Sequence, residues 1–173
     1  KSGIVEYTHK KQSGGHGQYG RVLIEIEPLE RGEYYSFTNA IKGVAISKGY
    51  IPGIEKGLHE QMEEGFLAGY PMMDIGISLV DGKEHPVDSS EMAFKLAGSM
   101  AFREAMEAAD PVLLEQIVRL TVSCPDDVVG EVIGDLNSRR GHPLGMEPKG
   151  AATEVRAEVP MAEVLEYAPD LRS

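Results

Sequence analysis

The residues best suited to contact a partner lie in a glycine-rich segment near the start of the chain. The segment reads Gly14-Gly15-His16-Gly17-Gln18-Tyr19-Gly20. Glycines permit a partner to approach the backbone closely, while Gln18 offers an amide and Tyr19 a ring on which a base can stack. This composition suits contact with RNA, and a plain long turn explains it equally well on these grounds alone.

The same segment fits the G-x-G-x-x-G pattern of dinucleotide-binding proteins, but the residues that follow it do not. In those proteins a helix follows the glycines, and its first backbone amides bind the pyrophosphate. Here Val22, Ile24 and Ile26 alternate with polar residues, which is typical of a half-buried strand. We therefore expect a glycine-rich loop between two strands and no nucleotide site.

A second polar cluster contains His85, Asp88, Ser89 and Ser90. These residue types occur in Ser-His-Asp hydrolases, but the chain has no Gly-x-Ser-x-Gly segment to expose a nucleophile. We favour the interpretation that Asp88 and the serines cap a helix that begins at Glu91, with His85 exposed on the preceding loop. A small acid–base hydrolase that uses His85 and Asp88 is the alternative.

Other familiar sites are not supported by the sequence. The Gly82-Lys83 pair precedes Glu84 where a P-loop has Ser or Thr, so nucleotide hydrolysis by that route is not expected. The five histidines lack zinc-site spacing, and a single cysteine, Cys124, excludes an internal disulfide. We expect no catalytic residue, no cofactor and no metal in this chain.

Composition limits the class of protein further. The chain has 173 residues, 42% of them hydrophobic, and a formal charge of −11, which argues against a polycationic nucleic-acid clamp. Residues 1–56 nevertheless carry eight basic and six acidic side chains, against three and twelve in residues 57–115. No apolar run approaches the roughly 18 residues of a membrane span, so we expect no membrane contact, and the single cysteine fits a reducing compartment, by default the cytoplasm.

Hydrophobic spacing predicts the elements that must position these loops. Asp81-Gly82 is expected to close the fourth strand, and Asp110-Pro111 to separate two domains, residues 1–112 and 113–173. For the first domain the spacing predicts strands near 4–11, 21–27, 34–38 and 73–80, a helix over 51–64, and a helix over 91–109 whose core face includes Met92, Leu96, Met100 and Ala101, with Met106 also in the core.

The second domain is predicted to contain strands near 117–122, 142–147 and 153–159, a helix over 125–141 and a short helix over 161–167. This order is one strand short of a split βαβ fold. We therefore expect the strand near 117–122 to have an open edge, bare or paired with a neighbouring chain, and otherwise no stable oligomer. Arg139 and Arg140 either complement a helix end or meet phosphate.

Six strings together resemble the bacterial translation elongation factor G family. In order along the chain, they are residues 12–20, Tyr50-Ile51-Pro52, His85-Pro86-Val87-Asp88-Ser89-Ser90-Glu91-Met92-Ala93-Phe94, Pro111-Val112-Leu113-Leu114-Glu115, Gly134-Asp135-Leu136-Asn137-Ser138-Arg139-Arg140-Gly141 and Leu144-Gly145-Met146-Glu147. The resemblance covers essentially the whole chain. It implies the fourth domain of the factor over residues 1–112 and most of the fifth over 113–173.

The resemblance also implies a fold and an activity. The fold is α+β: a β-sheet arm with a left-handed βαβ unit like that of a ribosomal protein, then an incomplete ferredoxin-like split βαβ domain that lacks its last strand. Full-length members are ribosome-dependent GTPases that move tRNA and mRNA and, with recycling factor, help to split ribosomes. Their GTP site lies in an N-terminal domain that this chain does not contain.

By the same resemblance, the arm enters the decoding region of the small subunit and contacts the tRNA paired to mRNA. The implied contact residues are Gly14, Gly15, His16, Gly17, Gln18, Tyr19 and His85, with Arg139 and Arg140 near large-subunit RNA. The chain departs from many members at residues 42–48, which lack a second glycine and a proline, and at Glu84 and Pro86. A paralogue that acts in ribosome recycling or protection is therefore an alternative.

Overall fold

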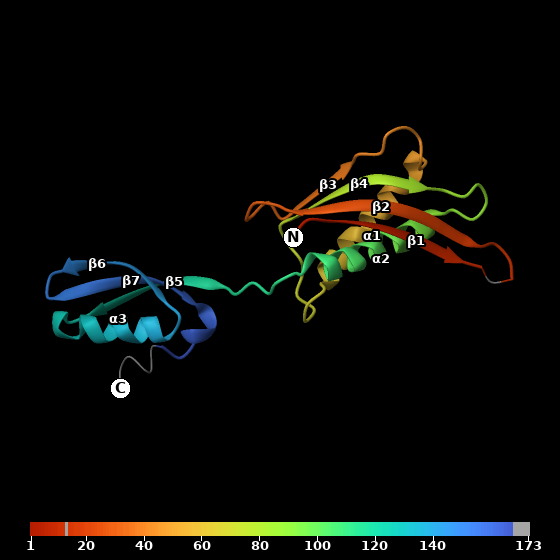
Figure 1. Ribbon diagram of the computed structural model, residues 1–173. Helices are drawn as coiled ribbons and strands as arrows, with labels where there is room; N and C mark the ends of the chain where they lie inside the picture. The colour runs from red at the N-terminus through yellow and green to blue at the C-terminus, as the bar shows by residue number, and fades with distance from the viewer. Residues whose placement is uncertain (13, 168–173) are drawn as a thin grey trace. The chain divides into compact units, whose positions relative to one another are not determined.

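The computed structural model describes residues 1–12 and 14–167. The chain divides into two compact units, and the boundary along the sequence lies between Val112 and Leu113 (Figure 1). Each unit has its own β-sheet and its own apolar core. The chain is therefore α+β. Within the described residues, no helix combines the length and the apolarity needed to cross a membrane.

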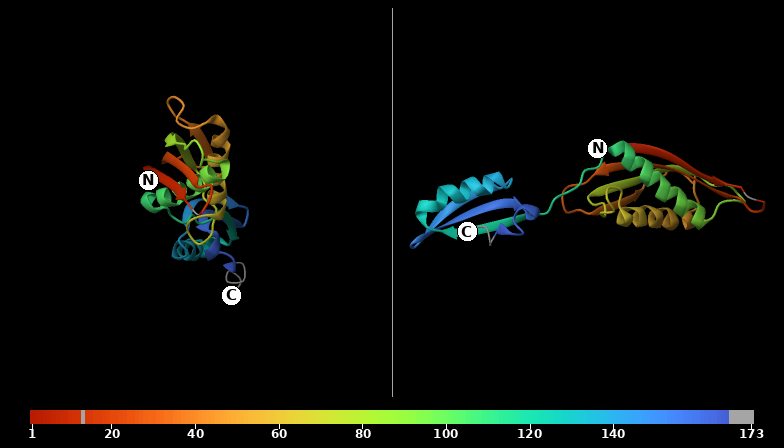
Figure 2. Two further views of the ribbon diagram at one scale, coloured as in Figure 1. Left: turned by 90° about the vertical axis from the view of Figure 1, so that its right-hand side faces the viewer. Right: turned by 90° about the horizontal axis from the view of Figure 1, so that it is seen from below.

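The first unit has a four-stranded sheet with the order β1-β2-β4-β3. Pairing is antiparallel except between β3 and β4, which are parallel and are connected through α1. Both helices lie on the same face of this sheet (Figure 2). The bounds are β1 Gly3–Lys11, β2 Gln18–Pro28, β3 Tyr35–Asn39, α1 Ile51–Glu64, β4 Ile75–Lys83 and α2 Glu91–Ala109, with a 3-10 helix at Lys48–Tyr50.

The core of the first unit lies between the sheet and these helices. Alternate residues of β2 and β4, such as Ile24 and Ile77, pack against Ile54 of α1 and against Phe94 and Phe102 of α2. The period-two spacing of the strands and the four-residue spacing of α1 in the sequence therefore correspond to buried faces.

The predicted core face of α2 is wrong in part. Met92 is 56% exposed, and Leu96 and Met100 are each 37% exposed, although Ala101 and Met106 are buried as expected. The buried face consists mainly of small residues and two phenylalanines: Ala93, Phe94, Ala97, Gly98, Ala101, Phe102 and Ala105. Small side chains are favoured there because α2 packs closely on α1, which leaves the longer apolar side chains at the rim.

Two strand boundaries also differ from the expectation. β4 continues through Asp81-Gly82 to Lys83, because Gly82 pairs with Val22 and the space that a Cβ would need there is filled by the side chain of Ile46. β2 begins at Gln18, which pairs with Lys11 across the hairpin. Gln18 and Tyr19 therefore lie on a strand and not in the loop.

The second unit has a three-stranded antiparallel sheet with the order β5-β7-β6 and the helix α3 packed on one face. β5 lies at a sheet edge within the described residues, as expected, and residues 168–173 lie outside that description. Where a helix over 161–167 was predicted, residues 161–163 form a 3-10 helix, residues 164–166 form turns, and of that range Tyr167 alone is α-helical in the described part of the chain. The bounds are β5 Ile117–Cys124, α3 Val129–Ser138, β6 His142–Lys149 and β7 Ala152–Pro160, with 3-10 helices at Asp126–Val128 and Met161–Glu163.

Candidate nucleic-acid interface

Three loops come together at one end of the first unit. They are the β1–β2 hairpin loop, the loop between β3 and α1, and the loop between β4 and α2 (Figure 1). We call residues 14–18, 40–48 and 84–90 the tip. Every residue of the arm that is expected to contact RNA lies in the tip or next to it.

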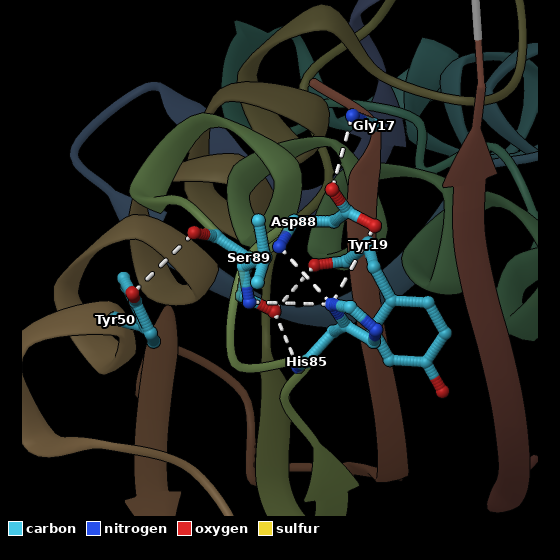
Figure 3. Close-up of polar contacts among 7 residues, drawn as sticks. Gly17, Tyr19, Tyr50, His85, Asp88 and Ser89 are labelled. Carbon is cyan, nitrogen blue, oxygen red and sulfur yellow. Dashed lines mark hydrogen bonds and ion pairs between the residues drawn. The ribbon is translucent and has the colours of Figure 1, made fainter. Parts of the chain in front are cut away.

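Asp88 joins the β4–α2 loop to the hairpin loop (Figure 3). The backbone N–H of Gly17 donates to Asp88 Oδ1 at 3.0 Å, and the backbone N–H of Tyr19 donates to the Asp88 carbonyl at 2.8 Å. A Cβ on residue 17 would lie 2.9 Å from Asp88 Cγ, so glycine is the residue that leaves room for this contact.

Ser89 supports the same junction. Its hydroxyl donates to the carbonyl of Tyr19 at 2.8 Å and accepts from the backbone N–H of His85 at 2.8 Å. The expected cap of α2 is confirmed for Ser90 alone, whose hydroxyl accepts from Ala93 N at 3.1 Å. Asp88 and Ser89 are not caps because their polar groups bind the hairpin.

His85 is held by its own loop. Its Nδ1 accepts the backbone N–H groups of Val87 at 3.3 Å and Asp88 at 3.1 Å. In the neutral ring this places the proton on Nε2, because one nitrogen donates when the other accepts. Protonation of Nδ1 would instead pair it with Asp88 Oδ2, 3.5 Å away. The imidazole is about half exposed and lies 6.0 Å from the Tyr19 ring.

These contacts do not form a hydrolytic triad. The Ser89 hydroxyl donates to a backbone carbonyl, and His85 Nδ1 accepts backbone N–H groups instead of the serine proton. In a Ser-His-Asp site the nucleophile's proton is aimed at the imidazole. The geometry therefore disfavours the acid–base alternative for His85 and Asp88.

Gln18 lies beside the hairpin loop, and in the described part of the chain only the oxygen of its side-chain amide has a hydrogen-bond partner. Gln18 Oε1 contacts His9 Nε2 at 2.9 Å across the two strands. Its NH₂ group has no hydrogen-bond partner among the described residues. The side chain is half-buried, whereas His16 at the end of the loop is exposed. Gln18 therefore offers donors to a partner from a fixed position.

The β3–α1 loop joins the tip through Glu84. The carboxylate of Glu84 accepts the backbone N–H of Ser47 at 2.8 Å and its hydroxyl at 2.9 Å. Next to Ser47, Ile46 is buried in the core at 3% exposure. The sequence analysis named no contact residue in this loop, although the short apolar run Val44-Ala45-Ile46 within a polar segment is a signal that could have found it.

Taken together with the strand ends beside it, the tip is basic although the molecule is acidic. Its two carboxylates accept hydrogen bonds from the tip itself. Five exposed lysines lie in the tip or at the strand ends beside it, and none forms an ion pair with any described residue: Lys10, Lys11, Lys42, Lys48 and Lys83. Among residues 1–12 and 14–167, no cluster of His, Cys, Asp and Glu could hold a metal ion.

Arg139 and Arg140 lie far along the sequence, in the second unit, where acidic groups surround them. Arg139 contacts Asp135 at 3.0 Å and lies over the Tyr167 ring. Arg140 pairs with Glu115 and Glu163 at 2.7 and 2.9 Å. The guanidinium of Arg140 lowers the pKa of Glu115, and both carboxylates raise the pKa of Arg140. An RNA contact by these arginines stays a prediction.

Comparison with known proteins decides the family. Residues 1–110 match the pattern described as elongation factor G, domain IV, and residues 112–173 match elongation factor G C-terminus. The chain belongs to the elongation factor G family. It is 54% identical over all 173 residues to elongation factor G from Aquifex pyrophilus. The resemblance drawn from the sequence is thereby confirmed.

A solved structure extends this similarity to the fold. A crystal structure of a protein from Thermus thermophilus superposes with a TM-score of 0.82 at 47% identity and covers 96% of this chain. The chain spans 25% of that structure's chain and 25% of the Aquifex elongation factor G. The family assignment therefore rests on about a quarter of the length of these relatives.

Proposed function

We propose that this chain is the ribosome-contacting part of an elongation factor that promotes movement of tRNA and mRNA. The tip contacts RNA in the decoding region, chiefly through Gln18, His85 and the backbone of residues 14–17. Ribosomal RNA and the tRNA–mRNA pair are the partners, with recycling factor as a further one. GTP hydrolysis belongs to a domain outside this chain, and the setting is the cytoplasm.

One observation carries this proposal: three loops meet in a basic tip whose carboxylates accept hydrogen bonds internally. Lysines attract the phosphate backbone, while glycine amides, Gln18 and His85 supply short-range contacts to RNA shape. Because the rest of the molecule is acidic, binding through bulk charge is weak. Such a tip suits contacts that form and break in each cycle of movement.

The test measures mRNA movement on bacterial ribosomes. This chain replaces the matching quarter of the Aquifex elongation factor G, and the graft is compared with its Gln18→Ala form. Loss of the amide should slow movement about tenfold, as expected when a transition-state contact of about 1.4 kcal/mol is removed.

Arg31→Gln is the matched control. Arg31 is exposed in the turn after β2, at the opposite end of that strand from the tip, and has no ion-pair partner among the described residues. It should leave the rate unchanged. Normal movement by the Gln18→Ala graft would contradict the site, and ribosome splitting without mRNA movement would favour the recycling paralogue.

A further inference from the structure

The β4–α2 loop touches both of the other loops in the tip. On one side Asp88 accepts the Gly17 N–H at 3.0 Å. On the other side Glu84 accepts the Ser47 N–H at 2.8 Å. His85 lies between these two acidic residues in the sequence. A single short segment therefore fixes the hairpin loop and the β3–α1 loop relative to one another.

The Asp88–Gly17 and Glu84–Ser47 contacts are both hydrogen bonds to a carboxylate. A carboxylate that accepts backbone N–H groups forms charge-assisted hydrogen bonds, which are shorter and stronger than bonds between neutral groups. Asp88 has a side chain only 27% exposed, and Glu84 is half-buried, so solvent competes poorly for either oxygen. Glu84 contacts Ser47 with both oxygens, at 2.8 and 2.9 Å.

The negative charge of Glu84 and Asp88 matters for a surface that binds phosphate. Two carboxylates in a phosphate-binding surface would repel RNA if they faced it without partners. Their hydrogen bonds to Gly17 and Ser47 hold these oxygens toward the neighbouring loops, and the exposed Lys42 and Lys48 lie on the same loop as Ser47.

We propose that Glu84 and Asp88 are positioning residues that join the three loops into one RNA-contacting surface. Asp88 sets the hairpin backbone beside Gln18, and Glu84 adds the β3–α1 loop, whose Lys42 and Lys48 meet RNA phosphates. This inference rests on the proposed function for its partner, while the positioning itself is a property of the chain alone.

Amide hydrogen exchange on the 173-residue chain tests the positioning. Asp88→Ala should reduce protection of the Gly17 amide about tenfold or more and leave the Ser47 amide unchanged. Glu84→Ala should reduce protection of the Ser47 amide and leave that of the Gly17 amide unchanged, so each variant is the control for the other. Asp88→Asn and Glu84→Gln keep an accepting oxygen and should restore protection. Amides of the β1–β2 ladder should exchange at the wild-type rate in all four.

The rate of mRNA movement by the graft then tests the link to RNA. Asp88→Ala should slow movement, and Asp88→Asn should rescue it. In a Gln18→Ala background, Asp88→Ala should slow movement by a smaller factor than in the wild type, because the part of its effect that acts through Gln18 is already lost. Unchanged exchange in the alanine variants would overturn the positioning role. Lost protection with unchanged movement would overturn its role in RNA contact, whereas failure of Gln18→Ala alone to slow movement would overturn the proposed function instead.

Discussion

Asp88 illustrates what residue types alone can and cannot reveal. The glycine-rich segment indicated Gln18 as a candidate contact, and the family resemblance implied contact roles for Gln18 and His85, which stay predictions. The sequence analysis placed Asp88 among the helix caps, yet its carboxylate binds Gly17, 71 residues away along the chain. Local spacing predicts local hydrogen bonds such as that of Ser90, whereas contacts between distant loops depend on the tertiary fold.

Tyr35 provides a prediction at the scale of a single residue. Burial raises the pKa of Tyr35 to about 12, and the Glu55 carboxylate adds to the effect. Because the folded state favours the neutral phenol, this contribution to stability is complete below about pH 10 and is lost as the pH rises to about 12. Thermal unfolding of the wild type should therefore shift to lower temperature over that interval.

The Tyr35→Phe variant should lose this alkaline shift in the unfolding of the first unit, whereas the raised pKa of Tyr167 leaves that of the second unit in place. The Tyr35 hydroxyl is buried without a hydrogen-bond partner in the described part of the chain, so its removal should leave the free energy of unfolding at pH 7 unchanged or raise it by up to about 1 kcal/mol. Tyr34, which is 65% exposed, gives the control Tyr34→Phe, in which the alkaline shift should persist. An equal alkaline shift in Tyr35→Phe would contradict the explanation.

At the scale of elements, the contact between α1 and α2 was the part that the sequence predicted least well. Strand alternation and the helix at Ile51–Glu64 were predicted correctly because each pattern lies within one element. The partner face of α2 was misjudged, since apolar size suggested Met92 and Met100. The informative signal was the spacing of Gly53 and Gly57, which permits close approach of two helices.

Glycine substitutions test this contact directly. At Gly57 a Cβ would overlap the carbonyl oxygen of Lys95, so Gly57→Ala should force the helices apart and destabilise the first unit by about 1–3 kcal/mol. Gly134 of α3 is exposed, and a methyl group added there would meet no atom within 4 Å, so Gly134→Ala should stabilise its helix by about 0.5–1 kcal/mol. Calorimetry of the two variants measures both effects, and destabilisation of equal size would contradict the packing argument.

At the scale of the whole molecule, charge is arranged so that the basic tip contrasts with an acidic remainder. The total of −11 predicts that RNA is not held by bulk charge, and the excess of basic residues in 1–56 pointed to the segment that holds four of the five lysines in or beside the tip. The sequence could not show that Lys83, from a strongly acidic stretch, lies at the same end of the sheet as Lys10 and Lys11.

Salt dependence measures this arrangement. Each lysine that meets a phosphate contributes about 1 to the slope of log K against log salt concentration. For the graft on ribosomes, Lys42→Gln combined with Lys48→Gln should therefore reduce the slope by about 2, and Arg31→Gln should leave it unchanged. A reduction of equal size per charge in Arg31→Gln would show that the effect is one of net charge and not of the tip.

Chemical footprinting of ribosomal RNA tests the central claim, contact between the tip and the decoding region, most directly. Ribosomes carrying tRNA and mRNA are probed with the grafted factor and with its Gln18→Ala form, after both are shown to fold. The wild-type graft should protect nucleotides of the decoding region, and Gln18→Ala should weaken that protection selectively. A folded graft that binds ribosomes and protects no nucleotide in the decoding region would contradict the account.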